Sequence, residues 1–222
     1  MKYDAKEFKR YPEIMSKEQG KLTDELREKI QAAETLVVVE DLYRPYRPKR
    51  RTRATIAKEK GLEPLANIIL LQMTKEPLEK EAEAFVSEEK EVKKSKDAIA
   101  GACDIIAESI SDEADYRMEI RRRTEAKGLI VSTAKDEKAE SVYENYYEFS
   151  EPVSKIAGHR VLALNRGEKE KFLNVKIEAP TEEILRYLEK KIITKENPQT
   201  KPVLQATIED AYNRQIAPAT ER

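Results

Sequence analysis

The densest run of residues that could do chemistry lies between Tyr43 and Arg53. Residues 44–53 contain six lysines or arginines and no acid, and two prolines stiffen the backbone between them. Because a stiff backbone is already ordered, cations held on it lose less entropy when they meet phosphates. The two tyrosines of the run have rings that can stack on unpaired bases. We call residues 43–53 the basic segment, and its composition suits single-stranded nucleic acid.

The same composition also fits a packing role. Arginine side chains pair well with carboxylates in interfaces, so the basic segment could bridge acidic helices of its own domain or of a neighbouring one. The whole chain has 42 lysines and arginines and 43 aspartates and glutamates, which gives a net charge of −1. It therefore has no overall excess of positive charge, and any basic site must be local. Both interpretations stay open on the residues alone.

Two further groups of basic residues have less specific patterns. Residues 121–123 are three consecutive arginines on an expected helix, so their side chains point about 100° apart and cannot form one patch. In the stretch 159–168, Gly167 would permit a tight turn that presents Arg166 to a ligand. Ion pairs within the protein are the alternative role for these side chains.

The residues give little support to catalysis. The only histidine has no acid linked to it by a motif, and the chain has neither a Gly-x-Ser-x-Gly elbow nor a glycine-rich phosphate loop. The only cysteine, Cys103, lies on the apolar stripe of an expected helix, which is typical of a buried side chain rather than a reactive thiol. One cysteine and one histidine exclude an internal disulfide and a structural zinc site. We therefore expect no enzyme, no metal and no cofactor.

The hydropathy pattern indicates a protein without membrane contact. The first residues carry acids and lack the apolar core of a signal peptide. The most apolar stretch, residues 65–73, is far too short to span a bilayer. We expect a cytoplasmic protein in a reducing compartment.

Composition and apolar spacing predict a mainly α, multihelical fold. Charged residues make up 38% of the chain and only six glycines occur, which is typical of amphipathic helices rather than of a β-sandwich. Apolar side chains recur at i, i+3, i+4 and i+7 through most of the chain. Helices are expected at 24–33, 53–61, 62–73, 78–86, 95–110, 111–128, 139–149, 182–193 and 203–216.

A loop and a small sheet complete the expected fold. Residues 36–43 are rich in β-branched side chains and fit either a short strand or a helical turn. Two prolines favour an ordered loop over 43–51. Apolar side chains alternate in 172–177, and this strand is expected to pair with one at 129–133, giving at most a two-stranded element. We expect one region over 1–222, with a sub-boundary near 157 and a linker at 195–202.

Several blocks of the sequence resemble one protein family. Residues 40–54, EDLYRPYRPKRRTRA, closely resemble the bacterial transcriptional accessory proteins of the Tex family. The blocks at 101–108 and 159–168 look like further parts of the same family. The resemblance covers roughly residues 17–222, and the proline-and-arginine block is too long and specific for a chance match.

The resemblance implies a longer protein and a role in transcription. Full-length Tex proteins have an N-terminal helical region, an RNase-H-like domain, helix-hairpin-helix elements and a C-terminal OB-fold that binds RNA. The family is thought to bind nucleic acid and to associate with the transcription machinery. No catalytic residue of the family maps onto this chain, so an enzyme acting on nucleic acid would need the missing RNase-H-like part. The block at 159–168 is expected to be helical.

We therefore expect a non-enzymatic helical scaffold module of a Tex-like transcription accessory protein that binds RNA or single-stranded DNA. The alternative is a docking module for a protein or a neighbouring domain, with no direct contact to nucleic acid. The expected partners are nucleic acid, the transcription machinery and the adjacent RNase-H-like domain. The candidate nucleic-acid contacts are Tyr43, Arg44, Tyr46, Arg47, Lys49, Arg50, Arg51, Arg53 and Arg166.

Overall fold

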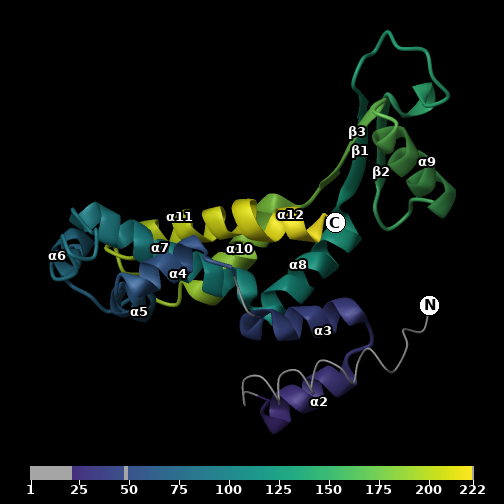
Figure 1. Cartoon of the computed structure of the whole chain (residues 1–222). Helices are drawn as coiled ribbons and strands as arrows, with labels where there is room; N and C mark the ends of the chain where they lie inside the picture. Colours follow the sequence, from purple (N-terminus) through teal and green to yellow (C-terminus); the bar gives the residue numbers. More distant parts are fainter. Residues whose placement is uncertain (1–21, 48–49, 222) are drawn as a thin grey trace. The chain divides into compact units, whose positions relative to one another are not determined.

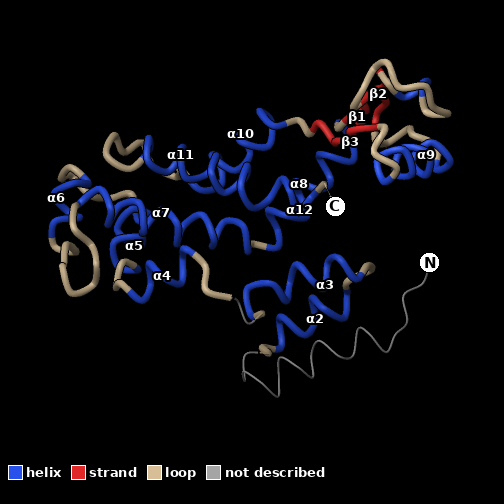
Figure 2. The backbone as a smooth tube through the Cα atoms, turned by 45° about the horizontal axis from the view of Figure 1, so that its top comes forward, coloured by secondary structure: helices blue, strands red, loops and turns tan. Residues whose placement is uncertain are grey.

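The computed structural model describes residues 22–47 and 50–221, and this part of the chain is mainly helical (Figures 1 and 2). The expected mainly α fold class is confirmed. No helix in the described part is both long and apolar enough to cross a membrane.

The chain folds as two compact units. Unit 1 contains the described residues up to Met118 together with Leu188–Ala217, and unit 2 contains Glu119–Tyr187 with the residues from Pro218 onward. The expected sub-boundary near residue 157 lies inside unit 2. The assignment of residues 1–222 to a single region stays a prediction.

Unit 1 is a set of helices packed around α7 (Ser95–Asp112), which contacts α4, α5, α6 and α11. The buried residues Ala98, Ala102, Ile106 and Ile110 of α7 recur every four positions, so one face of the helix lies in the core. The other elements of unit 1 are α2 (Asp24–Ala32), α3 (Leu36–Tyr43), the 3-10 turn η1 (Arg44–Tyr46), α4 (Arg53–Glu59), α5 (Glu63–Leu71), α6 (Leu78–Glu83), α11 (Lys201–Ala211) and the π-helical turn η3 (Tyr212–Ile216). Three helices, α8 (Ala114–Lys127), α10 (Thr181–Ile192) and α12 (Ala217–Thr220), begin in one unit and end in the other.

The ambiguous β-branched stretch is a helix, α3. Its Val39 and Leu42 are buried in one apolar cluster with Leu26 and Ile30 of α2. Because β-branched residues have only a small intrinsic penalty in a helix, packing against α2 decides the outcome. Helix α2 begins where expected, since the Thr23 hydroxyl accepts a hydrogen bond from the amide of Leu26 at 3.2 Å.

A buried ion pair joins α3 to the first turn of α8. Arg117 Nε donates to Asp41 Oδ1 at 2.9 Å, and Arg117 Nη1 donates to the carbonyl of Ser111 at 3.1 Å. Both charged side chains are less than a tenth exposed. Since little water reaches the pair, removing one charge would leave the other buried without this charge-assisted bond. The pair therefore fixes α3, and with it the start of the basic segment.

The connection between α10 and α11 is tied to the end of α5. The side-chain oxygen of the buried Gln72 accepts hydrogen bonds from the amides of Thr194 and Lys195 at 3.0 and 3.1 Å. Asn197 Nδ2 returns a bond to the carbonyl of Gln72 at 3.2 Å. The expected linker at 195–202 is thus hydrogen-bonded to α5, and its last residues already belong to α11.

Unit 2 contains a three-stranded antiparallel sheet in the order β2-β1-β3, with α9 alongside it (Figure 1). Ser132 of the central strand lies opposite Phe149 on one side and Val175 on the other. The expected pairing of the strands at 129–133 and 172–177 is confirmed. The elements are β1 (Leu129–Ala134), the 3-10 turn η2 (Glu144–Tyr146), β2 (Glu148–Pro152), α9 (Gly158–Lys169) and β3 (Leu173–Glu178).

The expected helix at 139–149 is wrong, and so is the limit of two strands. The segment contains η2 and the start of β2, which adds a third strand to the sheet. Tyr143 is buried against Leu164 and Leu173, but Val142 beside it is 86% exposed. The aromatic residues of this segment have helical spacing, yet aromatic side chains also favour strands. Pairing with β1 decides between the two.

The expected turn at Gly167 is also wrong. Gly167 lies buried within α9, and a Cβ placed on it would lie 2.6 Å from Leu173 Cδ1 and 3.1 Å from Tyr143 Cδ1. The glycine is needed because α9 approaches β3 too closely for a side chain. Arg166 is therefore presented by a helix, and the expected helical state of residues 159–168 is confirmed.

Candidate functional site

The basic segment runs from the last residue of α3 to the first residue of α4. After the 3-10 turn η1, the amide of Arg47 donates to the carbonyl of Tyr43 at 3.1 Å. At the other end Thr52 caps α4, because its hydroxyl accepts from the amide of Thr55 at 3.1 Å. Both ends are thus held by helices of unit 1, and the expected loop starts only after η1. Lys49, one of the candidate contacts, lies outside the described residues.

Arginines at the two ends of the basic segment face acids on α7. Arg44 Nε lies 3.3 Å from Asp112 Oδ1. Arg53 and Asp104 line a cavity of about 210 Å³, where burial raises the pKa of the Asp104 carboxyl and nearby arginines, Arg53 among them, oppose that rise. With Glu108 these acids stand at i, i+4 and i+8, so they form one acidic stripe along the helix. This stripe was not predicted from the sequence, although the i, i+4, i+8 spacing of its acids was the signal.

The middle of the basic segment faces solvent. Arg47 and Arg50 are exposed, and neither forms an ion pair with any residue in the described part of the chain. Arg51 Nη2 lies 3.2 Å from Glu59 Oε2, but both side chains are well exposed, so this pair contributes little. Arg47, Arg50 and Arg51 can therefore meet an external anion without leaving a buried partner.

The two tyrosines of the segment are less free than a stacking role requires. Tyr43 and Tyr46 are half-buried and pack against the apolar cluster that contains Leu26 and Val39. Their rings thus help to hold η1 on α2 and α3. Only the exposed part of each ring can meet a base.

Arg166 belongs to unit 2, whereas the basic segment belongs to unit 1. Its Nε donates to Glu170 Oε1 at 2.9 Å, one helical turn further along the chain. Glu170 also accepts a bond from the hydroxyl of Tyr143 at 2.9 Å, and these two bonds lower the pKa of its carboxyl. Arg166 thus forms the ion pair expected as its alternative role, while its side chain stays exposed.

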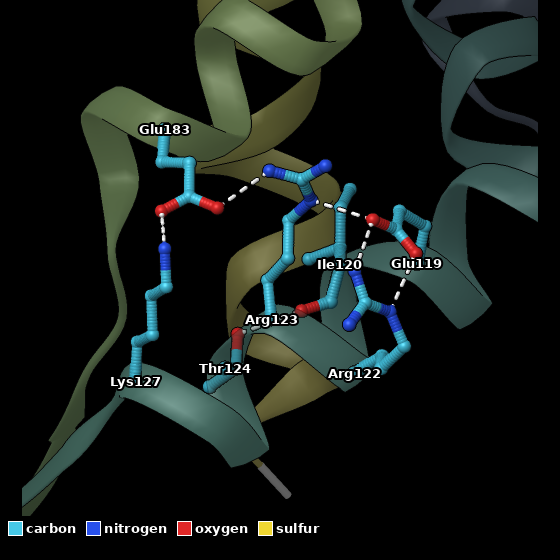
Figure 3. A network of polar contacts seen from close by, with 7 residues as sticks. All are labelled: Glu119, Ile120, Arg122, Arg123, Thr124, Lys127 and Glu183. Carbon is cyan, nitrogen blue, oxygen red and sulfur yellow. Dashed lines mark hydrogen bonds and ion pairs between the residues drawn. The ribbon is translucent and has the colours of Figure 1, made fainter.

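Two of the three consecutive arginines take part in a network on α8 and α10 (Figure 3). Arg122 and Arg123 both bond to Glu119, and Arg123 Nη1 also reaches Glu183 Oε1 at 2.6 Å. Lys127 binds the other oxygen of Glu183. The contacts with Arg122 and Arg123 lower the pKa of Glu119 to about 2, and the hydrogen bonds from Arg122 are the largest cause. The network stabilises unit 2 and leaves Arg122 and Arg123 already paired.

Two features of the described residues bear on metal binding and thiol chemistry. Among them no group of three or more potential ligand side chains could hold a metal ion. Burial raises the pKa of the Cys103 thiol, which keeps it protonated and unreactive at neutral pH.

Comparison with known proteins identifies relatives of the chain. It is 52% identical over 208 residues to an uncharacterized protein of Bacillus subtilis, YdcI, covering 92% of this chain and 29% of that protein. It is 40% identical over 162 residues to protein tex of Bordetella pertussis, covering 72% of this chain and 20% of that protein. It is 37% identical over 161 residues to the transcriptional accessory protein Tex of Neisseria gonorrhoeae, covering 71% and 21%. The chain therefore spans less than a third of the length of these relatives.

The family model described as Tex central region-like matches residues 72–221. This match takes in more than half of the chain, and it includes about half of unit 1 and all of the sheet of unit 2. The chain belongs to the Tex family.

Proposed function

We propose that this chain is a non-enzymatic helical module of a transcription accessory protein and that it binds single-stranded nucleic acid, RNA or DNA, through the basic segment. The observation that carries the proposal is the exposure of Arg47, Arg50 and Arg51 between two ends anchored to α7 and α4. A phosphate chain that meets such cations releases counterions, which supplies most of the affinity in sequence-independent binding.

The anchored ends give the basic segment a division of roles. Arg44 pairs with Asp112 of α7 and holds its end of the segment, whereas Arg53 lies near Asp104, whose ion pair is with Arg214. The arginines between them carry the contact with phosphate. A loop that is fixed at both ends loses less entropy on binding than a free chain does.

The remaining parts of the proposal concern the whole protein. The name transcriptional accessory protein, given to the relative of Neisseria gonorrhoeae, supports a role in transcription. We propose that the partners of this chain are the transcription machinery and an adjacent RNase-H-like domain of the full-length protein. We also propose that it acts in the cytoplasm and needs no cofactor. In this proposal the chain acts by holding nucleic acid and not by changing it.

The test is fluorescence anisotropy of the full chain with a single-stranded RNA oligonucleotide at about 50 and about 200 mM salt. Three phosphate contacts at a slope of about −0.7 each predict a loss of affinity of about 20-fold between these conditions. The variant Arg47→Gln/Arg50→Gln/Arg51→Gln should bind far more weakly and lose most of the salt dependence.

A matched control removes the same number of charges elsewhere. Lys93, Lys96 and Arg186 are exposed, and their replacement by glutamine should leave both the affinity and the salt slope close to those of the wild type. Equal losses in both triple variants would mean that only net charge matters, and an unchanged affinity in the first variant would exclude the basic segment as the site.

A second function is favoured by the acids of α7 that lie near two arginines of the segment. Because Arg44 and Arg53 face carboxylates of α7, the chemistry of the segment also suits acidic protein surfaces. In that case the segment docks a neighbouring domain or another protein. The wild-type chain would then show no salt-sensitive RNA binding at any of the concentrations tested.

A further inference from the structure

An open groove of about 620 Å³ lies in unit 1 between the end of α5 and the connection to α11. Its walls are residues 72–75 and 195–199. The side chains of Gln72 and Asn197 bond to the backbone of the opposite wall, so these two side chains hold the walls of the groove together.

Two large apolar side chains at or near the groove are mostly exposed. Met73, which lines the groove, is 67% exposed, and Leu71, two residues earlier, is 61% exposed. They are the most exposed large apolar side chains among the described residues of unit 1. Because burying apolar surface is favourable, a partner that covered both side chains would gain affinity.

The charges around the groove are unbalanced. Lys75 and Lys195 line it, and neither forms an ion pair with any acid in the described part of the chain. Lys195 Nζ instead donates to the backbone carbonyl of Leu71 at 3.2 Å, which places its charge at the end of α5. The only acid of the lining, Glu196, is already paired with Lys201 at 2.7 Å. The groove therefore presents two uncompensated positive charges.

We infer that this groove docks a segment of a partner protein in which apolar side chains are flanked by carboxylates. The apolar side chains would cover Leu71 and Met73, and the carboxylates would pair with Lys75 and Lys195. Nucleic acid fits less well, because the lining offers only two cations and no aromatic ring on which a base could stack. The inference shares no residue with the basic segment, so it does not depend on the proposed function.

The test uses the full chain and three short fluorescent peptides. The first is an amphipathic peptide of leucine and glutamate, the second has lysine in place of each glutamate, and the third has serine in place of each leucine. Only the first should bind. Its affinity should fall about tenfold or more in Lys75→Glu/Lys195→Glu, where attraction becomes repulsion. It should fall about tenfold in Leu71→Ser/Met73→Ser, where apolar contact is lost.

Control variants keep the result specific. Lys93→Glu/Lys96→Glu changes the same charge elsewhere in unit 1, and Val142→Ser removes an exposed apolar side chain from unit 2. Both should bind the first peptide as the wild type does, and circular dichroism should show all variants folded, since every substituted side chain is exposed.

Three results would overturn the inference. The first peptide could fail to bind the wild type at about 1 mM, which corresponds to about 4 kcal/mol. It could bind both groove variants unchanged. A single-stranded RNA could displace it and itself lose affinity in Lys75→Glu/Lys195→Glu, which would assign the groove to nucleic acid. Failure of RNA binding at the basic segment leaves the inference intact.

Discussion

Glu119 shows how the surroundings of a single carboxyl set the pH response of unit 2. Its two oxygens accept three hydrogen bonds from Arg122 and Arg123, and these lower the pKa from the usual 4.5 to about 2. Since the pKa is lower in the folded state than in the unfolded chain, the carboxylate stabilises the fold above pH 4.5. That contribution is lost as the pH falls from 4.5 towards 2.

We predict that Glu119→Gln destabilises unit 2 at neutral pH and that the difference from the wild type disappears in acid. The glutamine cannot carry the charge that Arg122 and Arg123 bind, whereas the wild type loses the same charge only when protonated. Thermal unfolding of both proteins, followed from pH 7 down to about pH 2, checks this.

Glu125→Gln is the matched control for this measurement. Glu125 is an exposed acid on the same helix that has no ion pair among the described residues. Its replacement should change the unfolding temperature little at neutral pH. A Glu119→Gln protein as stable as the wild type at pH 7 would contradict the role of the network in stability.

Helix α9 depends on one glycine for its contact with the sheet. Alanine has a helix propensity better than glycine by about 1 kcal/mol, so the sequence alone would predict that Gly167→Ala stabilises the helix. The Leu173 and Tyr143 atoms close to Gly167 reverse that expectation, because an added methyl group would overlap them.

We predict that Gly167→Ala lowers the free energy of unfolding by about 1–2 kcal/mol, the net of overpacking and helix propensity. Gly158→Ala is the control, because Gly158 starts the same helix and nothing lies within 4 Å of its added Cβ. That variant should be neutral or slightly stabilising. Urea unfolding followed by circular dichroism compares the two, and equal stabilities would refute the packing argument.

The elements that the sequence predicts well are those whose pattern has one interpretation. The stripe on α7 and the alternation in β3 leave no second choice of structure, and both are confirmed. The predictions of a helix at 139–149 and of a turn at Gly167 were wrong. Aromatic residues and glycine occur in several kinds of structure, and long-range contacts with β1 and β3 decide which one forms.

The candidate site was also predictable only where its sequence pattern has one interpretation. Its location between α3 and α4 could be predicted from proline and arginine alone. The sequence could not predict which arginines face α7 and which face solvent, because that depends on where Asp104 and Asp112 lie in space. The groove beside α5 gave no sequence signal, since it forms from residues more than a hundred positions apart.

At the scale of the whole molecule, each unit has a core of its own. Unit 1 has the cluster of Leu26, Ile30, Val39 and Leu42, together with the buried pair of Asp41 and Arg117, and unit 2 has the cluster of Tyr143, Leu164 and Leu173. Units with separate cores commonly open locally without unfolding the rest of the chain. This organisation would let the basic segment keep its structure while unit 2 changes.

We predict that a substitution in the core of one unit speeds hydrogen exchange in that unit and not in the other. Asp41→Asn leaves the Arg117 charge buried without its partner, at a cost of about 3–5 kcal/mol, and should speed hydrogen exchange in α2, α3 and the basic segment. Gly167→Ala should speed exchange in β1, β3 and α9 instead. Exchange measured by mass spectrometry on both variants and the wild type compares these regions directly. If either substitution sped exchange equally throughout the described chain, the two units would form one cooperative body, and RNA binding through the basic segment would then depend on the packing of α9.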